Sequence, residues 1–75
     1  MKTVIVVIDK VTMEPIPGKR IVLGFSWGMS KTVYTDDDGE AEIEHTSSAM
    51  AEVYINGTYV DKIQTPTRKK FYVKN

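Results

Sequence analysis

The stretch Asp36-Asp37-Asp38-Gly39-Glu40 holds the densest group of carboxylates in the chain, and calcium prefers carboxylate oxygens as ligands. Its spacing does not fill an EF-hand loop, and consecutive acids in a tight turn point in different directions. Asp side chains also accept hydrogen bonds from nearby backbone amides, and glycine supplies the positive φ that closes such a turn. We therefore expect a solvated turn here and no metal site.

Few other residues could carry catalysis. His45 is the only histidine, and the absence of cysteine removes thiolate catalysis and cysteine-ligated zinc. No nucleotide-binding glycine pattern and no nucleophile elbow occurs. We expect no catalytic residue, no cofactor and no enzymatic activity, with His45 as a satisfied or exposed histidine at the end of a strand.

Three residues near the C-terminus could bind an anion. In the run Arg68–Lys74, alternation sends Lys70, Tyr72 and Lys74 outward and leaves Phe71 inward. Basic groups beside an aromatic ring can follow a nucleic-acid backbone. Only a few phosphates could be neutralised, so such binding would be weak and salt-sensitive, and we do not expect nucleic acid to be the partner.

The charges are segregated along the chain although ten basic residues balance ten acidic ones. Residues 36–52 hold seven acids and no Lys or Arg, whereas residues 62–75 hold five bases and no acid. The simplest interpretation is that neighbouring strands of opposite sign pair across a sheet. The alternative is a basic edge that meets an anionic partner.

The single tryptophan lies in the unusual segment Gly24-Phe25-Ser26-Trp27-Gly28-Met29-Ser30. Small residues surround it, and Phe25 and Met29 stand two positions away on either side. One hypothesis is a loop that folds its aromatic rings over the end of the core. The other is an exposed platform for a protein partner, a sugar ring or a base, which makes Phe25, Trp27 and Met29 the candidate partner-binding residues.

The pattern of apolar residues and turn residues predicts seven short strands and no helix. They cover residues 4–8, 19–25, 31–35, 40–44, 49–55, 58–63 and 68–74. A hairpin with Asp38-Gly39 at its tip should join the third strand to the fourth. Asn56-Gly57 should close another, opposing Ile55 to Thr58, Tyr54 to Tyr59 and Val53 to Val60.

This pattern is typical of an all-β fold, a small antiparallel seven-stranded sandwich formed by residues 1–75 as a single domain. A small barrel of the five-stranded or SH3-like kind is the alternative. Ile16, isolated between Pro15 and Pro17, should plug one end of the core.

The run Val4–Ile8 is apolar at every position, which predicts a strand covered on both faces. The second face would lie under loops of the same domain, or meet a partner or a second copy, so any homo-oligomer should form through this first strand. The run is too short for a membrane span or a signal-peptide core. We expect no membrane insertion, and either a cytosolic protein or a module of a longer polypeptide.

Three segments together resemble a known family. The first is an apolar β-strand that ends in an aspartate, Val4–Asp9. The second has Pro-Ile-Pro-Gly before a strand, Glu14–Leu23. The third has Thr-Asp-x-Asp-Gly before a strand of alternating pattern, Thr35–Ile43. The combination resembles the prealbumin-like (transthyretin-like) sandwiches of the carboxypeptidase regulatory-like and Cna-B-like kind, which have an immunoglobulin-like shape. It covers roughly the first half of the chain.

The resemblance implies a binding or spacer module of the kind appended to enzymes, adhesins and envelope proteins. The hydroxyisourate hydrolases of the transthyretin group need several histidines, whereas this chain has only one. We therefore expect a non-catalytic protein-interaction or spacer module, whose partner is another protein or the parent polypeptide. The alternative is a small carbohydrate-binding or single-stranded nucleic-acid-binding protein that uses Phe25, Trp27, Met29 and the basic C-terminal strand.

Overall fold

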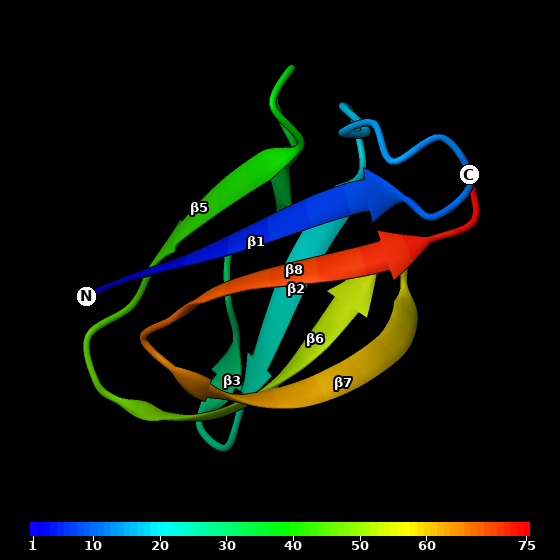
Figure 1. Ribbon diagram of the computed structural model, residues 1–75. Helices are drawn as coiled ribbons and strands as arrows, with labels where there is room; N and C mark the ends of the chain where they lie inside the picture. The colour runs from blue at the N-terminus through cyan, green and yellow to red at the C-terminus, as the bar shows by residue number, and fades with distance from the viewer.

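The computed structural model describes all 75 residues, which form eight β-strands and no helix (Figure 1). The strands are β1 (Lys2–Asp9), β2 (Arg20–Phe25), β3 (Gly28–Met29), β4 (Val33–Tyr34), β5 (Glu40–Glu44), β6 (Ala49–Ile55), β7 (Thr58–Thr65) and β8 (Arg68–Val73). They make two sheets, so the all-β class is confirmed. The count of seven is wrong because the two-residue β3 is too short for alternation to reveal it.

The smaller sheet has the order β5-β1-β8, with β1 at its centre. The β1–β5 pair is antiparallel, whereas β1 and β8 run parallel. The prediction of a purely antiparallel sandwich is therefore wrong. Acidic β5 and basic β8 also do not pair with each other, because β1 lies between them. The expected pairing of oppositely charged strands holds only in the larger sheet, where Glu52 of β6 opposes Lys62 of β7.

The outer face of β1 is covered by charged side chains from its two neighbours. Ile5 and Val7 point into the core, so Val6 points outward, and yet its exposed fraction is only 3%. Arg68 on β8 reaches across β1 and donates a 2.6 Å hydrogen bond to the carboxylate of Glu40 on β5. This contact raises the pKa of Arg68. Glu40 stands opposite Val6 and Arg68 opposite Val4, so the ion pair crosses the outer face beside Val6, whereas Val4 and Ile8 stay partly exposed.

The larger sheet has the order β3-β2-β6-β7, and β4 pairs with the first half of β2. The β6–β7 hairpin turns at Asn56-Gly57 and opposes Ile55 to Thr58 and Tyr54 to Tyr59, as predicted. The predicted Val53–Val60 pair is wrong. A β-bulge follows the second pair, so that Val53 opposes Asp61 and Val60 is the extra residue.

The residues Asp36–Glu40 form the expected tight turn, but the two strands that it connects do not pair with each other as a hairpin. Asp36 accepts hydrogen bonds from the amides of Asp38 and Glu40 at 2.9 and 3.0 Å. However, β4 pairs with β2 and β5 pairs with β1, so the turn carries the chain from one sheet to the other. The predicted hairpin is wrong because each strand finds its partner in a different sheet.

Gly39 is required in this turn by a close approach to β1. Its φ is +73°, and a Cβ added there would lie 2.6 Å from the backbone oxygen of Val7. The amide of Val7 in turn donates to the carbonyl of Gly39 at 2.8 Å. The crossing between the sheets is therefore fastened directly to the central strand.

The core lies between the two sheets and contains eleven buried apolar side chains. Ile21, Leu23 and Val53 come from the larger sheet, and Ile5 and Ile43 from the smaller one. Ile16 joins this cluster with an exposed fraction of 6%, which confirms it as a plug between its two prolines. Phe25 packs against the cluster from the end of β2.

Candidate protein-binding surface

Trp27 is exposed but held in place. It lies in the two-residue turn Ser26-Trp27 between β2 and β3, and 57% of its surface is exposed. Its ring stacks on that of Phe25, with centroids 4.6 Å apart and planes inclined by 9°. Since Phe25 is anchored on the core, one face of the indole is fixed and the other faces solvent. We call this stacked pair the Trp27 platform.

His45 lies next to Phe25 of the platform. Its ring lies 5.4 Å from that of Phe25, centroid to centroid. Nδ1 lies 3.0 Å from the carbonyl oxygen of Ser47, and Nε2 lies 2.7 Å from the hydroxyl of the buried Thr3. A carbonyl can only accept, so neutral His45 carries its proton on Nδ1 and accepts from Thr3. Both nitrogens are occupied, as expected for a satisfied strand-end histidine.

Met29 does not join the platform. In the β2–β3 pair it opposes Gly24, and its sulfur lies 3.3 Å from where a Gly24 Cβ would stand. The side chain thus lies on the outer face of the larger sheet, 62% exposed, whereas Phe25 lies on the inner face. The three predicted residues therefore form a pair and a separate neighbour, since alternate positions point to opposite faces.

Around Met29, the outer face of the larger sheet exposes several large side chains. Tyr54 and Tyr59 meet edge to face, with ring centroids 6.0 Å apart. Tyr54 donates a 2.9 Å hydrogen bond to Glu52, which raises the pKa of Tyr54. Alternation had placed both tyrosines on one face, but only the sheet order brings Met29 beside them. The exposed members of this outer face are Met29, Tyr34, Met50 and Tyr59.

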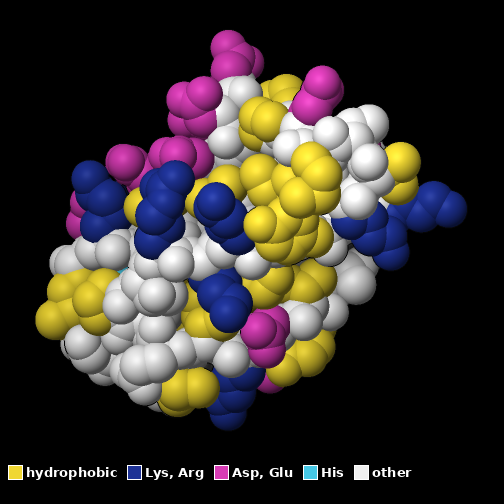
Figure 2. All heavy atoms as spheres, in the orientation of Figure 1, with side chains coloured by type: hydrophobic (Ala, Val, Ile, Leu, Met, Phe, Trp, Pro, Cys, Tyr) yellow, Lys and Arg dark blue, Asp and Glu magenta, His cyan; other side chains and the backbone are white.

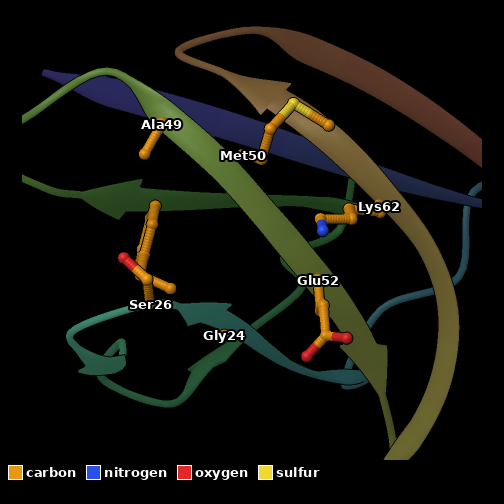
Figure 3. Close-up of a pocket in the computed structure, with 7 residues that line it drawn as sticks. Gly24, Ser26, Ala49, Met50, Glu52 and Lys62 are labelled. Carbon is orange, nitrogen blue, oxygen red and sulfur yellow. The ribbon is translucent and has the colours of Figure 1, made fainter.

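A hollow of about 380 Å³ opens beside the platform where β2 and β6 separate. Their pairing stops at Gly24–Glu52, so the end of β2 and the beginning of β6 diverge. Ser26 lies on one side of this splay hollow and Met50 on the other, with Glu52 of β6 and Lys62 of β7 beyond (Figure 3). Phe25 also lines it. Sequence analysis missed it because the hollow depends on where a strand pair stops.

Gly24 keeps the sheet surface low next to this hollow. A Cβ at that position would lie 3.2 Å from Cε2 of Tyr54 and 3.3 Å from the sulfur of Met29. Both neighbours are side chains that can move, so the glycine is not required by the backbone. These two side chains close over Gly24 and also line, with Val22, a second hollow of about 360 Å³.

The predicted anion-binding residues do not form one site. Lys70 and Tyr72 lie on the outer face of the smaller sheet, opposite Val6 and Ile8. Lys74 follows β8 and lines a different hollow with Lys19. The acidic row of β5 lies on the same outer face, two strand spacings or about 10 Å from Lys70. Figure 2 shows Lys and Arg beside Asp and Glu on this side, so no uniformly basic surface forms.

Comparison with known proteins finds no match among family models, curated proteins or solved structures. No group of three or more His, Asp or Glu side chains could hold a metal ion. The protein also has no helix that is long and apolar enough to cross a membrane.

Proposed function

We propose that this chain is a non-catalytic protein-interaction module that binds its partner through the Trp27 platform and the adjoining splay hollow. The observation that carries the proposal is an indole that is more than half exposed although it is stacked on an anchored ring. Interfaces draw much of their binding energy from tryptophan, and a ring already held in place loses little entropy on binding.

The surroundings of the platform favour a protein partner over a small ligand. Protein interfaces are enriched in Trp, Tyr, Met and Arg at their centres. Met50 lies across the splay hollow from Phe25, and Met29 and Tyr59 extend the exposed apolar surface over the same sheet. A surface spread over several strands suits another folded surface better than a molecule that must be enclosed.

The proposal includes a prealbumin-like, immunoglobulin-like sandwich that serves as an interaction or spacer module beside a protein partner or within a parent polypeptide. The Pro-Ile-Pro-Gly segment supports it because Ile16 is a core plug before β2. The Asp-x-Asp-Gly turn supports it because Gly39 is fastened to β1 at the crossing between sheets.

A carbohydrate-binding function is the second candidate. The observation that favours it is the exposed indole stacked on Phe25, which lines a hollow together with Ser26, Glu52 and Lys62, since sugars bind aromatic faces flanked by hydrogen-bonding groups. A combined site with the basic strand finds less support. Lys19 and Lys74 lie together at the start of β2, whereas Trp27 lies beyond the end of this six-residue strand. The length of the strand separates the lysines from Trp27 by about 17 Å.

Site-specific photo-cross-linking tests the protein-binding proposal. A photoreactive phenylalanine analogue replaces Trp27 in cells of the source organism, and the same analogue replaces Val11 as a control, because Val11 is 73% exposed in the β1–β2 connection. We expect a discrete cross-linked protein from position 27 only. No adduct, or the same adducts from both positions, would contradict the proposal. A saturable change of Trp27 fluorescence with an oligosaccharide would favour the second candidate.

A further inference from the structure

A third hollow, the end hollow, lies at the opposite end of the sandwich from Trp27 and has a volume of about 290 Å³. Its floor is apolar and comes from both sheets: Ile55 ends β6 and Val73 ends β8. Val60 forms a further apolar wall. Val60 lies there because of the β-bulge. In an unbroken hairpin Val60 would stand opposite Val53, and the bulge removes it from that position.

Every polar side chain around the end hollow can donate a hydrogen bond. Lys19 and Lys74 line it, and neither forms an ion pair. Asn56 accepts from the amide of Arg20 with its side-chain oxygen at 3.0 Å, which leaves its NH2 group free to donate. Thr58 adds a hydroxyl. The hollow therefore combines two positive charges and two neutral donors around an apolar floor.

Two acidic side chains near the end hollow do not line it and form no ion pair with its lysines. Asp9 lies opposite Val73 in the sheet, but its carboxylate accepts from the amides of Val11 and Thr12 at 2.8 and 3.3 Å. The carboxylate of Asp61, next to Val60, accepts from the amide of Lys62 at 2.8 Å. Both acids are engaged by local backbone, and neither lines the hollow.

We propose that the end hollow binds a carboxylate carried on a small apolar body, with Lys19 and Lys74 holding the charge and Val60 and Val73 contacting the body. Its volume lies near the lower limit of about 300 Å³ for small-molecule sites, which favours a short aliphatic or aromatic group. The carboxylate could belong to a free acid or to the C-terminus of a peptide, since both present the same chemistry. The inference is independent of the protein-binding surface.

Titration of isotope-labelled protein with hexanoate, followed by amide chemical shifts, tests this site. We expect saturable shifts at Thr58, Val60 and Val73, and weaker binding as salt rises. Lys19→Gln and Lys74→Gln should each weaken binding by at least about fivefold, which corresponds to about 1 kcal/mol. Lys31→Gln, an exposed lysine between β3 and β4, is the control and should leave the affinity unchanged.

Two kinds of ligand and one variant separate the contributions. Hexanamide lacks the charge and acetate lacks the apolar body, so both should bind at least about tenfold more weakly than hexanoate. Val60→Asp should abolish binding without unfolding the domain, because Val60 is 36% exposed. Equal binding of hexanamide, or of acetate or phosphate, would overturn the proposal. So would undiminished binding by the double lysine variant.

Peptides with an apolar last residue identify the source of the carboxylate. A peptide acid that binds more tightly than hexanoate, with the matched C-terminal amide inactive, supports the site and assigns it to peptide termini. Hexanoate binding without peptide binding supports the site and assigns it to free acids. Absence of saturable shifts with all of these ligands would overturn it.

Discussion

The outer faces of the two sheets differ in how far they expose their apolar side chains. On the smaller sheet, the Glu40–Arg68 pair crosses over β1 and leaves Val6 only 3% exposed. On the larger sheet, Met29, Tyr34 and Tyr59 remain more than half exposed. The charged side chains of β5 and β8 thus bury the central apolar residue of the smaller sheet, although Tyr72 at its end is 51% exposed. The larger sheet has no such ionic contact across its exposed apolar groups.

The largest expected effect separates the two faces of β1. Val7→Lys places an unpaired charge in the core, where Val7 is fully buried, and should cost more than about 4 kcal/mol and unfold the domain. Val6→Lys lies on the outer face, where the new ammonium can extend into water, and should cost about 1–2 kcal/mol. Chemical denaturation measures both.

If both variants unfold, Val6 is enclosed as deeply as Val7. Homo-oligomer formation through the first strand, which stays a prediction, would then lose its surface. The strand's two edges are already paired with β5 and β8, so only its outer face could contact a second copy.

The next largest effect concerns the crossing that separates the two sheets. Gly39→Ala and Gly18→Ala are a matched pair, because φ is +73° at Gly39 and +74° at Gly18. A Cβ at Gly18 meets nothing within 4 Å, whereas one at Gly39 strikes the Val7 oxygen. Gly18→Ala should cost about 1 kcal/mol for the backbone conformation alone, and Gly39→Ala about 3 kcal/mol or more. Equal denaturation midpoints for the two variants would contradict the close approach of Gly39 to the backbone of Val7.

The ion pair between Glu40 and Arg68 should contribute little to the free energy of unfolding. Glu40→Gln removes the charge that pairs with Arg68, and because the pair is partly exposed we expect a loss of under about 1 kcal/mol. The difference from the native protein should shrink at high salt, since mobile ions screen the pair. Denaturation at low and high salt measures it, with Glu14→Gln as a control of equal charge change, because Glu14 is exposed and forms no ion pair. A salt-independent loss would show that packing, and not charge, is involved.

Much of the fold could be predicted because local rules decide it. Alternation located seven of the eight strands to within a few residues, and Asn56-Gly57 predicted its hairpin because that turn needs little tertiary context. The Asp36–Glu40 turn was correct locally but wrong as a hairpin, since strand partners are chosen by burial across the whole domain. The parallel β1–β8 pair is equally invisible to local patterns.

The candidate site was predicted in part for the same reason. A tryptophan among small residues indicated Phe25 and Trp27, and the structure stacks them. Met29 lies on the other face because the turn occupies only Ser26 and Trp27. The splay hollow and the bulge at Val60 follow from where hydrogen-bond ladders stop or shift, which one strand's sequence does not encode.

The most direct test of the Trp27 platform, on which the proposed function rests, is acrylamide quenching of Trp27, the protein's only tryptophan. We predict a red-shifted, readily quenched emission, and a cost of about 1 kcal/mol or less for Trp27→Ala, because only one face of the ring is packed. A blue-shifted emission that resists the quencher would place the indole in the core. It would contradict the Trp27 platform as an open binding surface at the end of β2.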